Sequence, residues 1–356
     1  MTSKRTERSE AEYELDGEVL RQGMLRRVPK RIFGAGQVRL PSVPALLEHY
    51  VETLGKLFAL HGRAYNAEEL QHLRGLLADK LAQGFAAARN SVVVVDYQTD
   101  SAPQQTLSYT LTLETASLET EYADWVSTRP APYFGKDPDC KVMDVARSLG
   151  APAEVPVLDI GAGAGRNALA LARAGFPTDA VEQSPALATI LRDGAAHAEL
   201  TLRLFEGDFS SAALELPAAY YRLLVASELV SDLRDVPALT RLFERAAELL
   251  TSKGVLVLNA FVPVGGYAPD AIARELSYVL WSTIFLREEL KAAAAAHGFA
   301  LLSEESVFDY EKARLPASAW PPTSWFEQWT RGVDTFDVPM SRAPVEMRWF
   351  TFRKLA

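Results

Sequence analysis

Three acidic side chains at the ends of short apolar runs could bind a positively charged ligand. Asp159 stands two residues before a glycine-rich turn, Glu182 ends the next apolar run, and Asp208 follows the third. Ligands of open parallel sheets bind at the carboxyl ends of the strands, where these acids would meet. A carboxylate at Glu182 can accept from both hydroxyls of a ribose. Asp208 can accept from an adenine amino group while Phe209 covers the ring. The set therefore suits a cationic adenosyl compound.

The glycine-rich turn lies between the first apolar run and the first helical pattern. Gly161, Gly163 and Gly165 are spaced as G-x-G-x-G, and Arg166 stands where the dinucleotide-binding fingerprint G-x-G-x-x-G has its last glycine. Because glycine has no Cβ, the backbone can turn sharply and a ligand can lie against it. The N–H groups at the start of the next helix can face anionic groups of that ligand. Plain packing and a nicotinamide dehydrogenase are the alternatives, and the three acids favour the adenosyl ligand.

The elements that must carry these residues alternate between strand and helix patterns from residue 151 onward. Apolar and β-branched runs predict strands, whereas apolar residues at helical spacing predict helices. Such alternation with short links is typical of a parallel sheet covered by helices. The expected strands are 155–160, 178–181, 200–205, 221–226, 255–261, 299–303 and 345–352, and the expected helices are 168–174, 187–195, 236–250 and 286–297.

Residues 1–150 are predicted to form a mainly helical N-terminal region that contains one β-hairpin. Asn66 and Glu69 have the spacing of a capping box at the start of one helix. The hairpin follows from a β-branched run and from a segment that alternates between apolar and polar residues. The expected helices are 44–60, 66–89, 117–127 and 142–149, and the expected hairpin strands are 92–97 and 107–114.

Segment 20–39 is strongly basic, unlike the rest of the chain. Its cations are Arg21, Arg26, Arg27, Lys30, Arg31 and Arg39. They form a solvated face, or a partner for the acidic body, or an arm that touches an anionic substrate or closes over the site.

The composition limits the class of protein and its compartment. The 356 residues carry a net charge of −9 and are 48% hydrophobic, which supports a sizeable core and argues against a broad nucleic-acid surface. Cys140 is the single cysteine, so one chain has neither an internal disulfide nor a cysteine zinc cluster. The histidines lack metal-ligand spacing, and we expect no metal site. With no apolar signal core and no run of ~18 apolar residues, we expect a cytoplasmic protein without membrane contact.

The glycine turn and its acids resemble one enzyme family. Asp159-x-Gly161-x-Gly163-x-Gly165, followed by Glu182 and Gly207-Asp208, resembles the class I S-adenosylmethionine-dependent methyltransferases. The resemblance covers residues 153–261 closely and 285–356 more loosely. It implies a seven-stranded, mostly parallel, doubly wound sheet over 151–356, whose last strand runs antiparallel beside the fifth. It also implies S-adenosylmethionine as cofactor, with Asp159 near the methionine ammonium, Glu182 on the ribose, and Asp208 and Phe209 around the adenine. The cofactor-binding residues expected on this basis are Asp159, Gly161, Gly163, Gly165, Glu182, Gln183, Asp208, Phe209 and Ser227.

Two insertions and the N-terminal region are candidates for enclosing the substrate. Residues 262–285 and 310–344 leave or return to the sheet near its ligand-binding edge, so we expect a lid and a pocket wall. The aromatic residues between Trp320 and Phe336 are either core or a pocket for an aromatic or amine acceptor. In this family an extension such as residues 1–150 commonly caps the active site or forms a homodimer contact.

Methyl transfer requires little acid–base chemistry, so no residue is marked as catalytic by its type alone. Most of the acceleration can come from holding donor and acceptor in line with water excluded. Glu228, after the fourth strand, is a candidate to bind an acceptor amine or accept its proton. Its alternative role is to orient the cofactor or a loop. Tyr267, on a glycine-flanked turn, is a candidate to line the acceptor site, and otherwise packs.

The sequence thus predicts a methyltransferase that acts on an oxygen or nitrogen of a small molecule. A protein or RNA methyltransferase that uses segment 20–39 is the first alternative. A non-catalytic partner that binds S-adenosylmethionine is the second.

Overall fold

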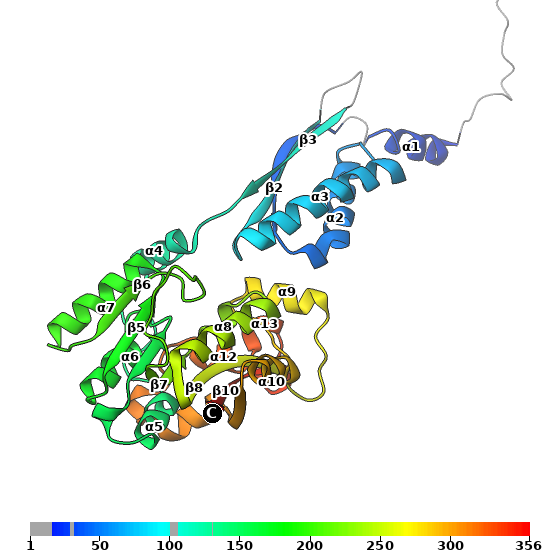
Figure 1. Ribbon diagram of the computed structural model, residues 1–356. Helices are drawn as coiled ribbons and strands as arrows, with labels where there is room; N and C mark the ends of the chain where they lie inside the picture. Colours follow the sequence, from blue (N-terminus) through cyan, green and yellow to red (C-terminus); the bar gives the residue numbers. More distant parts are fainter. Residues whose placement is uncertain (1–15, 29–31, 100–105, 130) are drawn as a thin grey trace, which may run out of the picture. The chain divides into compact units, whose positions relative to one another are not determined.

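The chain folds as two compact units, which divide between Thr115 and Ala116 (Figure 1). A computed structural model describes residues 16–28, 32–99, 106–129 and 131–356. The units are Met1–Thr115 and Ala116–Ala356. Residues 116–150, which the sequence pattern grouped with the N-terminal region, therefore belong to the second unit.

The first unit is an antiparallel sheet with two long helices packed on it. Its sheet has the order β1-β2-β3, and the predicted hairpin is the pair β2 and β3. The sequence pattern did not predict β1, which begins inside the basic segment 20–39; Lys30 and Arg31 of that segment lie outside the described residues. The elements are α1 (Gly17–Leu25), β1 (Ala35–Pro41), α2 (Leu47–Leu60), α3 (Ala67–Ala87), β2 (Val92–Thr99) and β3 (Leu107–Glu114).

The core of the first unit lies between its helices and its sheet. Phe58 of α2 and Leu77 of α3 are fully buried against Val93 and Val95 of β2. The predicted capping box is present, because the N–H of Glu69 donates to Asn66 Oδ1 and the N–H of Asn66 donates to Glu69 Oε2, both at 2.9 Å.

The second unit is built on a seven-stranded sheet of order β6-β5-β4-β7-β8-β10-β9. Strands β4 to β8 are parallel to one another, and β10 runs antiparallel between β8 and β9. This confirms the predicted mostly parallel sheet and the antiparallel last strand beside the fifth. The strands are β4 (Val157–Ile160), β5 (Thr178–Glu182), β6 (Arg203–Glu206), β7 (Tyr221–Ala226), β8 (Leu250–Pro263), β9 (Phe299–Ser306) and β10 (Val345–Lys354).

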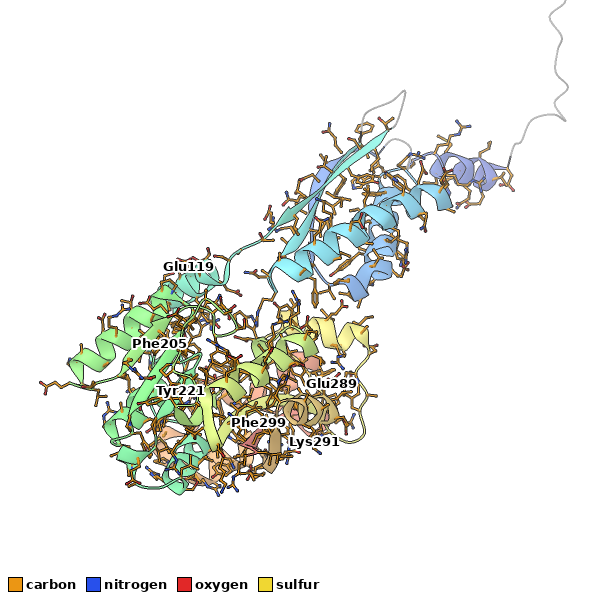
Figure 2. The ribbon with its side chains drawn as sticks, viewed as in Figure 1. Glu119, Phe205, Tyr221, Glu289, Lys291 and Phe299 are labelled. Carbon is orange, nitrogen blue, oxygen red and sulfur yellow. The ribbon has the colours of Figure 1, made fainter. Side chains whose placement is uncertain are left out.

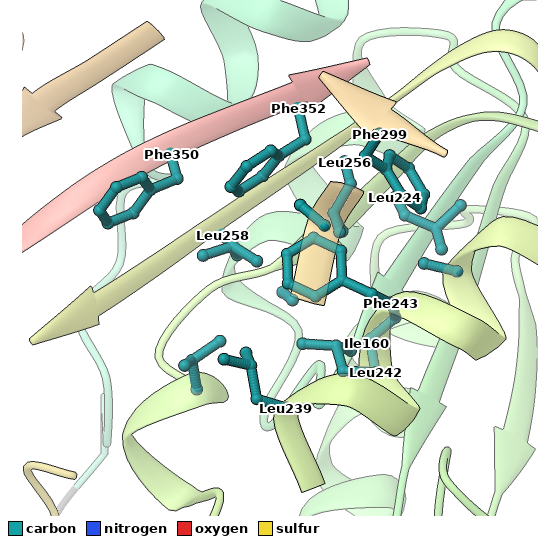
Figure 3. Packing of buried hydrophobic residues seen from close by; sticks show 14 of the residues in the cluster. Ile160, Leu224, Leu239, Leu242, Phe243, Leu256, Leu258, Phe299, Phe350 and Phe352 are labelled. Atoms are coloured by element: carbon teal, nitrogen blue, oxygen red, sulfur yellow. The ribbon is translucent and has the colours of Figure 1, made fainter. Parts of the chain in front are cut away.

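Helices cover both faces of this sheet. They are α4 (Leu118–Thr128), α5 (Cys140–Ser148), α6 (Arg166–Arg173), α7 (Pro185–His197), α8 (Val236–Leu249), α9 (Ala271–Val279), α10 (Arg287–Ala296), α11 (Val307–Arg314), α12 (Phe326–Thr330) and α13 (Val333–Phe336). On one face, Phe243 of α8 makes edge-to-face contacts with Phe299 and Phe352, at centroid distances of 5.6 and 5.1 Å (Figure 3). Tyr221 is buried at the start of β7, whereas Lys291 on α10 is exposed (Figure 2). In the described part of the chain, no helix combines the length and the apolar character needed to cross a bilayer.

Helices α4 and α5 belong to the second unit because they pack on its other helices. Helix α4 contacts α7, and α5 contacts α11. Val142 and Ala146 of α5 are fully buried in the core of the sheet face that also contains Trp349. This packing explains why the unit begins at Ala116.

The aromatic residues of insertion 310–344 extend the hydrophobic core of that same face. Phe326 is buried, and its ring meets Trp320 edge-on at 5.8 Å. Trp329 meets Phe261 of β8 edge-on at 5.4 Å. Of the two alternatives for this cluster, these contacts favour core packing.

Candidate functional site

Backbone hydrogen bonds join the carboxyl ends of β4, β5 and β6 into one edge. The N–H of Gly161 donates to the carbonyl of Val181 at 2.9 Å, and the N–H of Gly207 donates to the carbonyl of Glu182 at 3.0 Å. The glycine turn after β4 and the Gly207-Asp208 turn after β6 therefore flank the end of β5. This is the arrangement expected for the three predicted acids.

The three glycines of the turn differ in what surrounds them. All have positive φ, 69° at Gly161, 56° at Gly163 and 91° at Gly165, a conformation that favours glycine. A Cβ on Gly163 would lie 3.3 Å from the Phe134 ring, whereas one on Gly165 would lie 2.3 Å from Leu191 Cδ1. Gly165 is thus required by the packing of α6 on α7. At Gly163 the missing side chain leaves room for the Phe134 ring beside the turn.

Asp159 is buried in β4 with one carboxylate oxygen unused. Asp159 is 3% exposed, and its Oδ2 has no hydrogen-bond partner among the described residues. Burial, and then the carboxylate of Asp139, raises the pKa of Asp159 to about 7. A buried polar atom without a partner is costly, and a cationic donor placed there would remove the cost. The methionine ammonium of S-adenosylmethionine is such a donor.

Glu182 connects β5 to the glycine turn. Its Oε2 accepts from the N–H of Gly163 at 2.7 Å, and its Oε1 accepts from the N–H of Ser184 at 2.7 Å. Burial raises the pKa of Glu182, and these hydrogen bonds oppose that rise. A carboxylate has about four acceptor sites, so capacity remains for ribose hydroxyls.

The other predicted cofactor residues lie at this edge in different settings. Ser227 is buried, and its hydroxyl donates to Asp139 Oδ2 at 2.7 Å. Gln183 is exposed beside Glu182. Asp208 is exposed and accepts from the N–H of Ser210 at 2.8 Å. Phe209 is buried in the core with Ile160 and Val181, so its predicted role over the adenine stays a prediction.

A buried ion-pair network beside the turn was not predicted from the sequence. Arg166, the first residue of α6, donates to Asp139 Oδ2 at 3.1 Å and to Glu228 Oε1 at 2.7 Å. Asn167 Nδ2 also donates to Asp139 Oδ2, at 2.8 Å. Burial alone would lower the pKa of Arg166, but Asp139 and Glu228 raise it overall. The sequence offered two signals for this network. Arg166 stands where the dinucleotide-binding fingerprint has its last glycine, and Asp139 ends the 130–139 segment.

Glu228 is held in this network at the end of β7. Its φ is 59°, an uncommon conformation for a residue with a side chain, and its N–H donates to Asn259 Oδ1 at 2.6 Å. Burial raises the pKa of Glu228, and Arg166 opposes that rise. The structure thus brings Glu228 to the same edge as Asp159 and Glu182.

Asp139 reaches the site because another residue caps its helix. Asp139 is the N-cap of α5 but makes no side-chain cap hydrogen bond. Instead Glu311 of α11 accepts from the N–H groups of Cys140 at 2.7 Å and Lys141 at 3.2 Å. The Asp139 carboxylate is then free to bind Arg166.

The loop before α5 covers the glycine turn. The backbone carbonyl of Phe134 accepts from Arg166 Nη1 at 3.1 Å. The Phe134 ring stacks on the ring of Trp125 in α4, with the two centroids 4.9 Å apart. This hydrogen bond and this ring contact hold the 131–139 loop beside the glycine turn.

Among the contacts of the described residues, none joins Tyr267 to Asp159, Glu182 or Glu228. It follows Gly265 and Gly266, and its ring packs edge-on against Phe336 at 5.6 Å. Burial raises its pKa. The proposed catalytic role of Tyr267 stays a prediction.

The strand order and the acid-lined glycine turn are those of the class I S-adenosylmethionine-dependent methyltransferases. Residues 157–254 match the family model described as a methyltransferase domain, so this part of the chain is a methyltransferase domain of that superfamily. S-adenosylmethionine is the cofactor of such domains, and the unused Asp159 oxygen fits its cationic group.

Searches for related proteins gave matches among solved structures. The chain is similar to a protein assigned as a sarcosine dimethylglycine methyltransferase from Galdieria sulphuraria, at 17% identity and TM-score 0.48, over 61% of this chain and 84% of that one. It is similar to the [4+2]-cyclase SpnF at 19% identity and TM-score 0.46, over 65% and 90%. It is also similar to geranyl diphosphate C-methyltransferase from Streptomyces coelicolor A3(2), at 15% identity and TM-score 0.45, over 60% and 75%. No curated protein matched the chain. The fold assignment rests on the strand order and the family match.

Proposed function

We propose that this protein transfers a methyl group from S-adenosylmethionine to an oxygen or nitrogen of a small-molecule acceptor. The observation that carries the proposal is the buried Oδ2 of Asp159 beside the glycine turn, for which the described residues offer no hydrogen-bond partner. Asp139 and Glu228 bind one guanidinium, that of Arg166, and Asp159 lies close enough to feel its charge. Glu182 adds a further carboxylate at the glycine turn. Since negative charge is in excess, the site favours a cationic ligand.

Each group at the edge has a role in this proposal. Asp159 would hold the methionine ammonium, Glu182 the ribose hydroxyls, and Asp208 the adenine amino group. S-adenosylmethionine supplies a methyl group on a sulfonium, which needs placement more than activation. Glu228 and the 131–139 loop would orient the acceptor and exclude water.

The proposed activity can be tested by mixing the protein with S-adenosylmethionine and a pool of metabolites. We expect S-adenosylhomocysteine to form, and mass spectrometry of the pool to reveal a product heavier by one methylene. With that acceptor, Glu228→Gln should lower turnover about 10–100-fold while changing cofactor affinity much less. The matched control is Glu244→Gln, on the exposed face of α8.

Two results would count against the proposal. Binding of S-adenosylmethionine without S-adenosylhomocysteine from any pool would favour the non-catalytic alternative. Turnover only with peptide or RNA pools, weakened by salt, would favour a macromolecular substrate.

A further inference from the structure

Helix α1 of the first unit carries large apolar side chains that are open to solvent. All nine residues of α1 are described, and none of them is buried. Met24 is 72% exposed, and Leu20, Leu25 and Val28 are each about half exposed. Single exposed apolar side chains are common on folded proteins, whereas a group of neighbouring ones marks a surface that contacts something else.

Local hydrogen bonds define α1 and both of its ends. The carboxylate of Asp16 accepts from two N–H groups of the first turn, at 2.8 and 3.2 Å. At the other end, the N–H of Val28 donates to the carbonyl of Leu25 at 3.1 Å, so the chain keeps turning through Val28. Residues four apart in a helix share a face, so Leu20 and Met24 lie together, and Val28 follows them.

The apolar residues of α1 lie among positive charges. Segment 20–34 contains five lysine and arginine residues and no acid, whereas the whole chain has a net charge of −9. Subtracting these five charges leaves −14 for the other residues. Arg21 forms an ion pair with Glu18, but both side chains are exposed, so the pair is weak. Arg26 and Arg27 are exposed at the end of the helix.

An anionic bilayer matches this combination of side chains better than two other partners do. A nucleic acid would use the cations for its phosphates and leave the apolar side chains in water. A second copy would place like charges opposite each other, and a nine-residue helix is only about 13 Å long, too short for a standard interface. At a bilayer surface, apolar side chains enter the acyl boundary while cations face the lipid phosphates.

We propose that α1 binds to the surface of a bilayer that contains anionic phospholipid. This inference goes beyond the proposed function and does not depend on it. It departs from the expectation of no membrane contact, which rested on the lack of a long apolar run, because a helix that lies in the interface needs no such run. The acidic remainder of the chain does not prevent binding, since charges more than about 8 Å away are largely screened at physiological salt.

The test measures flotation of the full-length protein with two kinds of vesicle at physiological salt. One kind is phosphatidylcholine alone, and the other contains about one third phosphatidylglycerol, which gives the surface a negative potential. We expect binding to the anionic vesicles to be at least about tenfold stronger. Added salt should weaken this binding, because it screens charges at the surface.

Two double variants separate the charged and the apolar contributions. Arg26→Gln with Arg27→Gln should lower binding to the anionic vesicles about tenfold or more. Arg26→Lys with Arg27→Lys should keep most of the binding, because the charge is retained. Leu20→Gln with Met24→Gln should lower binding about fivefold or more, because the apolar contact is lost.

The matched control is a double variant of α2 that removes one cation and one apolar side chain. Lys56 and Leu60 are both exposed, with 73% of the Lys56 side chain and 69% of Leu60 open to solvent. Lys56→Gln with Leu60→Gln should leave vesicle binding unchanged. Because all of the substituted positions are exposed, we expect circular dichroism to show folded protein for every variant.

Four results would overturn this inference. The first is equal binding to both kinds of vesicle, and the second is binding that survives both glutamine variants of α1. The third is tighter binding to duplex DNA than to the anionic vesicles, or self-association that Leu20→Gln with Met24→Gln abolishes. The fourth is loss of S-adenosylmethionine binding in the α1 variants without vesicle binding by the wild type, which would favour an arm over the site. Cofactor binding that is unchanged in these variants keeps the two proposals separate.

Discussion

At the residue scale, the proposed site carries a charge arrangement that costs stability in the absence of a ligand. Asp159 is buried, its Oδ2 has no partner among the described residues, and its pKa is raised to about 7 by burial and Asp139. Arg166 opposes this rise, and Glu182 adds to it. A raised carboxyl pKa means that the folded state holds the proton more tightly than the unfolded state. The stability that this protonation contributes is full below about pH 4 and is lost as pH rises through about 7.

We therefore predict that Asp159→Asn stabilises the protein while weakening cofactor binding. At pH 8 the variant should unfold at higher urea concentration, by on the order of 1–4 kcal/mol, and the difference should shrink towards pH 5. S-adenosylmethionine affinity should fall, because the anionic partner of the ammonium is removed. Urea titrations at both pH values and calorimetry check the two signs, with Asp193→Asn as control. A variant less stable than wild type at pH 8 would contradict the assigned burial cost.

The residues of the site fall into two groups. Some lie where a local sequence pattern marks a strand end, and others meet only because the fold brings distant segments together. Asp159, Glu182 and the glycines could be predicted because each sits at a strand end that the sequence pattern reveals. Asp139 and Arg166 could not, because their ion pair joins segments that only the fold brings together. Gln183 and Tyr267 were placed by position alone, and their roles remain predictions.

At the element scale, one helix cap controls where an acidic side chain points. Glu311 of α11 caps α5 and also accepts from Trp349 Nε1 at 3.1 Å, while Asp139 faces Arg166. Burial, and then Asp139, raises the pKa of Glu311 to about 7. Loss of Glu311 would leave the first N–H groups of α5 to compete for the Asp139 carboxylate.

We predict that Glu311→Ala lowers the free energy of unfolding by about 1–3 kcal/mol and weakens S-adenosylmethionine binding. Glu311→Gln, which can still accept one of these hydrogen bonds, should recover part of both losses. Denaturant titration and calorimetry measure the two effects, and Glu215→Ala at an exposed position is the control. Unchanged cofactor affinity in a destabilised Glu311→Ala protein would show that Asp139 does not depend on this cap.

Most elements could be predicted because their periodicity is strong. The seven strands of the second unit and the helices α6, α7, α8 and α10 follow from apolar runs and helical spacing, with ends that differ by a few residues. The short helices α11, α12 and α13 were not predicted. Strand β1 was not predicted because glycine, glutamine and arginine interrupt its apolar residues. The aromatic residues of 310–344 gave no decisive pattern, since core packing and a ligand pocket require the same side chains.

At the scale of the whole molecule, the groups assigned to cofactor binding all lie in the unit Ala116–Ala356. The sequence pattern located the sheet but placed the start of its domain at residue 151, because the link between α5 and β4 reads as a natural break. Packing of α4 and α5 on the second unit is a long-range property that local periodicity does not reveal. The role of the first unit as a cap or a homodimer contact remains a prediction, as do the lid segments and the cytoplasmic location.

We predict that a protein beginning at Ala116 folds and binds S-adenosylmethionine within about threefold of the full chain. One beginning at Ala151 should bind poorly and aggregate, because it lacks Asp139 and exposes the core that α5 covers. Size-exclusion chromatography and calorimetry on both fragments check this. Equal binding by the two fragments would mean that the 131–139 loop is not part of the site.

The most direct test of the central claim is calorimetric titration of the full-length protein with S-adenosylmethionine at pH 7, in two buffers of different ionisation enthalpy. A cation placed beside Asp159 should lower its raised pKa of about 7, so at pH 7, where this carboxyl is about half protonated, we expect Asp159 to release up to about half a proton per molecule bound. Gly163→Val should weaken this binding at least about tenfold, and Gly75→Val in α3, where a side chain meets open space, should not. No binding heat in either buffer, or binding that Gly163→Val leaves unchanged, would contradict the account.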